Sequence, residues 1–139
     1  MALYYADASA LVKLVRDEPE SDSLRRFLSD AELVSCELVV TEIPRAIRRA
    51  ASQDPHLSLD VLLERAGELI DAIGLAPLER TLLLAAGALS EPSLRALDAI
   101  HVVAAADLAP LDAFVSYDER QAAAARLAGL RTVSPGVAS

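Results

Sequence analysis

Short apolar runs alternate with longer amphipathic stretches along the chain. The apolar runs predict strands at 3–6, 32–35, 73–78, 113–117 and 130–133, the last of them at a sheet edge. Apolar residues spaced three and four apart predict helices at 9–16, 20–29, 35–51, 58–72, 79–89, 94–108 and 119–128. Helices between short strands are typical of a mostly parallel sheet covered on both faces. The pattern therefore predicts a three-layer α/β/α sandwich with four or five strands.

Local signals add detail to three of these helices. Ser35 is a candidate N-cap for the helix that follows it. Pro44 lies inside that helix and removes one backbone donor, which predicts a kink just after Glu42. The helix at 94–108 is apolar nearly all round, so we expect it to be central. Within it, His101 is expected to be a hydrogen-bonded helix residue rather than a metal ligand.

The length and composition predict a single domain spanning residues 1–139. The chain is 53% hydrophobic and long enough to bury a core without disulfides, and it shows no repeat or linker. Its apolar runs fall short of the roughly 18 to 20 residues that cross a bilayer, and no positively charged leader precedes Asp7. The short runs lead us to expect no membrane association. Cys36 is the one cysteine, so we expect a reduced, buried thiol in a cytoplasmic protein.

The charge balance limits how the chain could handle nucleic acid. Its formal net charge is −8, whereas proteins that bind nucleic acid through diffuse charge are normally basic. A phosphodiester substrate would therefore require metal ions, local arginine clusters or a partner. Twelve of the thirteen basic residues are arginine. Arg45, Arg48 and Arg49 fit either a phosphate-contacting strip or a solvated helix face paired with nearby acids.

Four carboxylates occupy positions that surface charge does not readily explain. Asp7 ends the first strand and Asp118 follows the strand at 113–117, so both project at one sheet edge if these strands are neighbours. Glu42 lies in a helix, and Asp98 lies in the most apolar helix, where a lone ionised acid is costly. A hard divalent cation would relieve their mutual repulsion, and carboxylates favour Mg²⁺ or Mn²⁺ over zinc. Such a cation can activate water and stabilise charge during phosphodiester hydrolysis.

Each acid also has a simpler interpretation. Asp7 and Asp118 could cap the helices that follow them. Asp98 could be a first-turn acid favoured by the helix dipole. Glu42 could form an ordinary helix-surface pair with Arg45, three residues later. The convergence of all four acids, rather than any one of them, favours a metal site.

Four segments, in order, carry a resemblance to a known family. They are Asp-Ala-Ser-Ala-Leu-Val at 7–12, Val-Val-Thr-Glu-Ile-Pro-Arg-Ala at 39–46, Leu-Asp-Ala-Ile-His at 97–101 and Phe-Val-Ser-Tyr-Asp at 114–118. Through them the sequence resembles PIN-domain ribonucleases, specifically the toxin of a VapBC toxin-antitoxin pair. The resemblance spans almost the whole chain and implies a PIN-like α/β/α fold.

The resemblance also implies an activity and a set of site residues. The activity is that of an endoribonuclease dependent on Mg²⁺ or Mn²⁺, which leaves a 5′-phosphate and a 3′-hydroxyl. The acids carried over as catalytic are Asp7, Glu42, Asp98 and Asp118. Asp7 and Asp98 would hold the principal metal, and Asp118 would join them as a ligand. Ser9 and Ser116 would support the acids.

Partners follow from the same resemblance. Toxins of this kind usually form homodimers, cut tRNA or rRNA, and are blocked by a small antitoxin in the acidic groove. These expectations concern the RNA substrate, the cognate antitoxin and a second copy of the chain.

Two other enzyme classes place an Asp after the first strand. A haloacid-dehalogenase-type phosphatase would have a second Asp two residues later, where this chain has Ser9. A response-regulator receiver would have paired acids there and a late lysine, but the one lysine is Lys13. A non-catalytic, acidic protein-interaction module stays open, and Asp98→Asn would leave such a docking surface intact.

Overall fold

A five-stranded parallel sheet forms the centre of the computed structural model, which describes residues 1–138. Its strand order is β3-β2-β1-β4-β5. The strands are β1 (Ala2–Ala6), β2 (Ala31–Cys36), β3 (Gly74–Ala76), β4 (Ala113–Val115) and β5 (Thr132–Val133). The central position of β1 places the end of the first strand beside the end of β4, as the candidate site requires.

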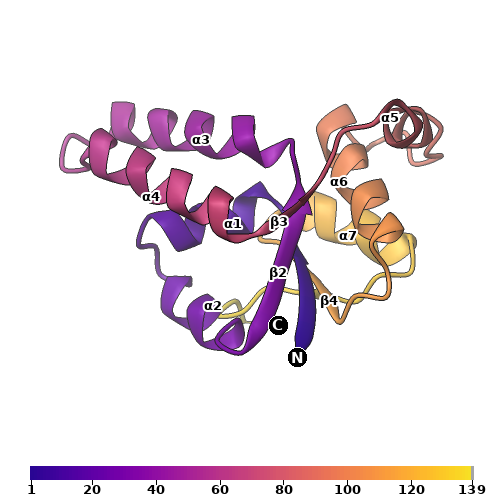
Figure 1. The fold of residues 1–139 in the computed structure, drawn as a ribbon, viewed down its shortest axis with the longest axis horizontal. Coiled ribbons are helices and arrows are strands. Elements are labelled where there is room, and N and C mark those ends of the chain that lie inside the picture. The colour runs from indigo at the N-terminus through magenta and orange to yellow at the C-terminus, as the bar shows by residue number, and fades with distance from the viewer. Residues whose placement is uncertain (139) are drawn as a thin grey trace.

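Helices cover both faces of this sheet. One face carries α1 (Ala8–Val15), α2 (Ser21–Phe27), α3 (Val39–Gln53) and α4 (Leu59–Ala72), and the other carries α5 (Arg80–Gly87), α6 (Ala96–Asp107) and α7 (Glu119–Leu127) (Figure 1). The two groups lie left and right of the sheet in Figure 1. The predicted three-layer α/β/α architecture is confirmed. Within residues 1–138, none of the helices combines the length and apolarity needed to cross a membrane.

Alternating side chains of the central strands divide the core into two clusters. Tyr5 and Phe114 pack toward α5, α6 and α7, whereas Ala6 and Val115 pack toward α1, α3 and α4. Tyr5 and Phe114 are direct partners across β1 and β4, and their rings stack with centroids 5.2 Å apart. The sheet thus fixes the ends of β1 and β4 from both faces.

The prediction that Ser35 caps a helix is wrong. Ser35 lies in β2, where its hydroxyl donates a 2.7 Å hydrogen bond to the carbonyl oxygen of Ala6 in β1. The strand continues to Cys36, and α3 begins only at Val39. The helix then runs on through Pro44 to Gln53, so the proline does not end it.

The remaining boundaries differ from prediction by a few residues, and one difference matters for the site. The strand predicted at 113–117 is β4, which ends at Val115 rather than at residue 117. Ser116 and Tyr117 therefore belong to the connection into α7, where their polar groups are free to bond across to the β1 end. The third strand is shorter than 73–78 and occupies only Gly74–Ala76.

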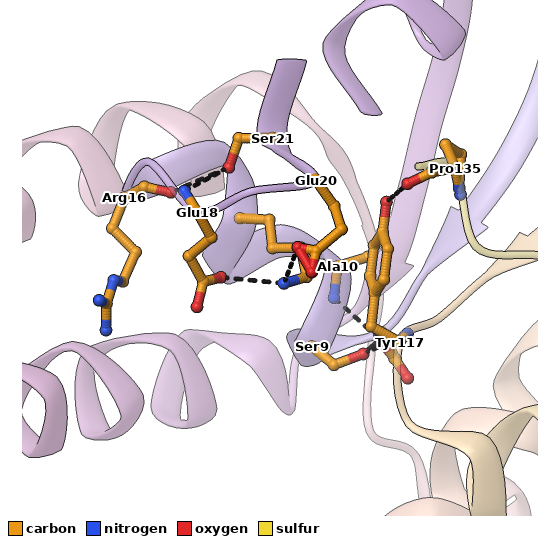
Figure 2. Close-up of polar contacts among 10 residues, drawn as sticks. Ser9, Ala10, Arg16, Glu18, Glu20, Ser21, Tyr117 and Pro135 are labelled. Carbon is orange, nitrogen blue, oxygen red and sulfur yellow. Dashed lines mark hydrogen bonds and ion pairs between the residues drawn. The ribbon is translucent and has the colours of Figure 1, made fainter. Parts of the chain in front are cut away.

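The C-terminal segment is held against the α1–α2 region. The Tyr117 hydroxyl donates a 2.7 Å hydrogen bond to the carbonyl oxygen of Pro135 (Figure 2). Gly136 has a φ of +88°, and a Cβ built there would lie 2.9 Å from the Cβ of Ser23 in α2. Both the backbone conformation and the close approach therefore require glycine at this position.

Candidate active site

Asp7 lies at the junction of β1 and α1 and is 1% exposed. Its Oδ1 accepts hydrogen bonds from the Ala10 backbone N–H (3.1 Å) and the Ser9 hydroxyl (2.6 Å), and its Oδ2 accepts one from the Ser116 hydroxyl. The helix-capping interpretation of Asp7 is thus confirmed. Burial raises the pKa of the Asp7 carboxyl, and the hydrogen bonds from Ser116 and Ser9 offset this only in part.

The two predicted supporting serines connect Asp7 to the turn between β4 and α7. Ser9 Oγ accepts a 2.9 Å hydrogen bond from the backbone N–H of Tyr117, and the two residues lie side by side in Figure 2. Ser116 Oγ accepts a 3.1 Å hydrogen bond from the backbone N–H of Asp118. Each hydroxyl therefore donates to Asp7 and accepts from a backbone N–H group of the β4–α7 turn. These two bonds fix the orientation of the hydroxyl.

Asp118 and Asp98 lie at the starts of two adjacent helices. Asp118 caps α7, with Oδ1 accepting from the backbone N–H groups of Arg120 (3.0 Å) and Gln121 (3.3 Å). Asp98 lies in the first turn of α6, as the dipole interpretation expected. The side-chain amide of Gln121 donates a 3.2 Å hydrogen bond to the Asp98 carbonyl oxygen. This bond ties the two helix starts together.

Three of the four predicted acids share one pocket. Its volume is about 720 Å³, and its lining residues are Glu42, Arg49, Arg95, Leu97, Asp98, Asp118, Glu119 and Arg120. Asp7 is buried outside this lining and reaches it through Ser116 and the Asp118 backbone. Burial, together with the negative charges of Asp118 and Glu42, raises the pKa of Asp98 against the opposing effect of His101 and Arg95. The pocket therefore favours positive charge.

Glu42 does not form the surface pair with Arg45 that its simpler interpretation offered. Its Oε1 lies 2.6 Å from Nε2 of His101, which is 1% exposed. Nδ1 of His101 lies 2.8 Å from the Tyr5 hydroxyl and 3.8 Å from Cys36 Sγ. The predictions of a hydrogen-bonded His101 and a buried Cys36 are confirmed. Tyr5 also belongs to this network, although its position in an apolar strand does not predict this.

Burial is the largest single influence on the pKa values of this network, and hydrogen bonds and charges act with or against it. Burial lowers the pKa of His101, but hydrogen bonds with Cys36 and Glu42 and the charge of Glu42 raise it overall to about 10. Burial raises the pKa of Tyr5 well above its usual value, so its hydroxyl keeps the proton. Burial also raises the pKa of Cys36, but the nearby His101 outweighs this effect and lowers it.

The donor set suits a hard cation better than a soft one. Among residues 1–138, no three His, Cys, Asp or Glu side chains converge closely enough to form a metal-binding cluster. Three acids nevertheless surround one pocket, and the mutual repulsion at Asp98 is the kind that a divalent cation relieves. Asp7 uses three of its roughly four acceptor sites and keeps capacity for a further contact. The residues thus fit Mg²⁺ or Mn²⁺ chemically, and binding requires them to close on the ion.

Arginines form the rest of the pocket wall. Arg49, Arg95 and Arg120 line it together with the acids. In the described part of the chain none of the three makes an ion pair, unlike Arg25 and Arg126. Of the predicted arginine strip in α3, only Arg49 reaches this pocket.

Sequence comparison identifies relatives along nearly the whole chain. The PIN domain model matches residues 4–127. Ribonuclease VapC35 of Mycobacterium tuberculosis (strain ATCC 25618 / H37Rv) is 38% identical over 142 residues, which cover 98% of this chain and 99% of the relative. Ribonuclease VapC47 of Mycobacterium tuberculosis (strain CDC 1551 / Oshkosh) is 34% identical over 140 residues, which cover 96% and 98%. These relatives match this chain in length as well as in sequence.

Two solved structures share the fold. VapBC2 from Rickettsia felis, solved bound to a DNA fragment from its promoter, superposes with a TM-score of 0.68 at 13% identity, covering 96% of this chain and 98% of that one. PAE2754 from Pyrobaculum aerophilum gives a TM-score of 0.64 at 19% identity, covering 95% of this chain and 84% of that one. At these identities the likeness establishes the architecture alone.

Proposed function

The chain belongs to the PIN-domain family, among the VapC ribonucleases, and from this membership we propose that it is the endoribonuclease toxin of a toxin-antitoxin pair. One observation carries the proposal beyond the family name. Glu42, Asp98 and Asp118 come from three separate helix starts and line a single pocket, and Asp7 is held beside it by the Ser116 hydroxyl. Placing several carboxylates close together costs electrostatic free energy. Such a grouping is therefore more typical of a functional site than of a purely structural one.

The proposed cofactor is Mg²⁺ or Mn²⁺, held by Asp7, Asp98 and Asp118. When bound, such an ion supplies positive charge and Lewis acidity for phosphodiester hydrolysis. The oxygen-only donor set supports this choice over zinc. The repulsion between Asp98 and its neighbouring acids favours a cation at this place.

The chain's own residues supply orientation and proton acceptance. Ser9 and Ser116 donate to opposite oxygens of Asp7 and hold its carboxylate plane in one direction. Glu42 uses one oxygen for His101, which leaves the other to accept a proton from a water in the pocket. Asp118 caps α7 with Oδ1 alone, so Oδ2 remains for the site. Glu42 and Asp118 therefore each have one carboxylate oxygen held by the fold and a second oxygen left for chemistry.

RNA is the proposed substrate, with tRNA or rRNA as the expected class. The protein is acidic overall, so binding must depend on local cations. Arg49, Arg95 and Arg120 line the pocket together with the acids, so we expect them to contact phosphates near the scissile bond.

The proposal extends to partners. The VapBC2 structure from Rickettsia felis supports a cognate antitoxin as the partner of this chain. A homodimer, a single domain spanning 1–139 and a cytoplasmic location complete the proposal.

Cleavage of total bacterial RNA by antitoxin-free protein tests the proposal directly. The reactions contain Mg²⁺ or Mn²⁺, with EDTA and the Asp7→Asn variant as controls. We expect discrete cuts that need metal, disappear in the variant and carry 5′-phosphate ends. Intact RNA in every lane, from protein shown to be folded and to bind Mn²⁺, would instead favour the acidic interaction module.

A further inference from the structure

A network of buried hydrogen bonds joins Tyr5 of β1, His101 of α6 and Glu42 of α3. Each of these three elements carries a site acid or directly precedes one. The Tyr5 hydroxyl lies 2.8 Å from Nδ1 of His101, and Nε2 of His101 lies 2.6 Å from Oε1 of Glu42. Tyr5 belongs to β1, which ends one residue before Asp7, and His101 lies one turn after Asp98 in α6. Glu42 lies in the first turn of α3.

Solvent exposure increases along this network from Tyr5 to Glu42. Tyr5 and His101 are 0% and 1% exposed, whereas the Glu42 side chain is 21% exposed. The imidazole ring is also packed against the Tyr5 ring, edge to face, with centroids 5.8 Å apart. The histidine is therefore fixed in the core, and the glutamate is the member that meets the pocket.

The direction of the hydrogen bond to Glu42 follows from the groups involved. An ionised carboxylate only accepts, so Nε2 of His101 carries the hydrogen and donates it to Oε1. This holds whether Nδ1 accepts from Tyr5 or also carries a hydrogen. Both ring nitrogens are engaged and the ring is buried, so His101 has no lone pair directed into the pocket for a metal.

We propose that His101 is a positioning residue for Glu42, anchored by Tyr5, and that its Nε2–H holds one carboxylate oxygen so that the other serves the pocket. The inference rests on the proposed nuclease function. A free glutamate at the start of a helix samples many rotamers, and a charge-assisted hydrogen bond from a fixed ring selects one of them. Groups that orient site carboxylates in this way typically affect activity about 10- to 100-fold.

A double-mutant cycle separates positioning from simple packing. The four full-length proteins are the wild type, His101→Leu, Glu42→Gln and the double variant, assayed for RNA cleavage with Mn²⁺. Leucine occupies the core without donating a hydrogen bond. We expect His101→Leu to lower kcat by about 10- to 100-fold with KM nearly unchanged. With Glu42→Gln already present, the same change should cost no more than about 2-fold.

Two further variants test the hydrogen bond itself. His101→Gln keeps a donor and should recover part of the lost kcat. Val102→Ala loosens the same helix at a buried position of the core, and it controls for general destabilisation of α6. By proton NMR, the wild type should show a downfield Nε2–H signal that His101→Leu removes and Glu42→Gln shifts. This signal does not depend on RNA or metal.

The possible failures are distinguishable. Equal losses from His101→Leu in both Glu42 backgrounds, in a wild type that cuts RNA, would reject the positioning role and leave the nuclease proposal standing. So would a kcat loss in Val102→Ala as large as that in His101→Leu. A wild type that cuts no RNA with Mn²⁺ would reject the proposed function together with the role assigned to His101.

Discussion

The Ser116 hydroxyl forms hydrogen bonds with two residues of the site, Asp7 and Asp118. It donates to Asp7 Oδ2 and accepts from the Asp118 backbone N–H. Ser116→Ala would leave a buried carboxylate oxygen without its donor, so we expect a loss of about 1–3 kcal/mol in the free energy of unfolding. RNA cleavage should fall about 10- to 100-fold, because Asp7 is no longer oriented. Urea denaturation and initial cleavage rates measure the two effects.

The matched control is Ser52→Ala. Ser52 is exposed in α3, and its hydroxyl bonds only to the Arg49 carbonyl of the same helix. Its replacement should change the free energy of unfolding by less than about 0.5 kcal/mol. Equal effects of the two substitutions would show that the Ser116 hydroxyl has no special role.

Burial and the neighbouring acids both disfavour a negative charge on Asp98. Its pKa is raised by burial and by Asp118, so the ionised form is disfavoured in the folded protein. Asp98→Asn should therefore leave metal-free stability unchanged or higher. Wild type should gain about 2.7 kcal/mol at Mn²⁺ concentrations of 100 Kd, and the variant should not. Thermal melts with and without Mn²⁺ provide the measurement; a metal-free loss above about 1 kcal/mol would assign Asp98 a structural role.

At the residue scale the sequence identified the acids better than their partners. Asp7, Asp98 and Asp118 stand at strand ends and helix starts, and those positions can be read from local pattern. The partner of Glu42 could not be read in that way. Rules for neighbouring helix positions suggested Arg45, but the contact is with His101, 59 residues later. Only the tertiary fold brings these two side chains together, because α3 and α6 cover opposite faces of the sheet.

Two glycines show how the elements constrain their own sequences. Gly136 has a positive φ and lies against Ser23, whereas Gly67 lies inside α4 with open space where a Cβ would project. Gly136→Ala should lower the free energy of unfolding by about 1–3 kcal/mol, through left-handed backbone strain and contact with α2. Gly67→Ala should raise it by about 0.5–1 kcal/mol, because alanine is the better helix former. Urea denaturation of both variants compares them; the same sign for both would contradict the structure.

At the element scale, apolar periodicity located the helices of residues 1–138, but it matched the first residue of α7 alone and missed that of α3 by four residues. Ser35 had the chemistry of a cap, yet its hydroxyl bonds across to Ala6 in the neighbouring strand. Likewise, Ser116 and Tyr117 extend an apolar strand pattern, but their polar groups bond to Ser9, Asp7 and Pro135. Local propensity cannot anticipate such contacts, since the partners come from other elements.

The protein as a whole carries a net negative charge, yet three arginines line the pocket that contains the acids. If Arg95 contacts an RNA phosphate, Arg95→Gln should reduce the magnitude of the slope of log Kobs against log salt by about 0.7. Binding of single-stranded RNA to the cleavage-deficient Asp7→Asn protein at several salt concentrations measures this slope. Arg25→Gln is the control, because Arg25 is exposed, pairs with Asp17 and lies outside the pocket. An unchanged slope for Arg95→Gln would remove Arg95 from the RNA contacts.

At this largest scale, the alternation of strands and helices correctly predicted a parallel sheet with two covered faces. The strand order was not predictable from that alternation. The placement of β4 beside β1 depends on how Tyr5 and Phe114 stack and on which helices cover each face. The neighbouring positions of Asp7 and Asp118 were therefore a conditional expectation, and the sheet order fulfils the condition.

The brevity of the two outer strands has a consequence for the protein's behaviour at high concentration. β3 has three residues and β5 has two, so each sheet edge offers few unpaired backbone groups to a neighbouring molecule. Long, flat edge strands are the usual templates for the growth of cross-β aggregates. Short edge strands offer too few backbone hydrogen bonds for a second chain to pair with them stably. A protein so rich in apolar residues can thus accumulate during synthesis without fibril formation starting from its own sheet.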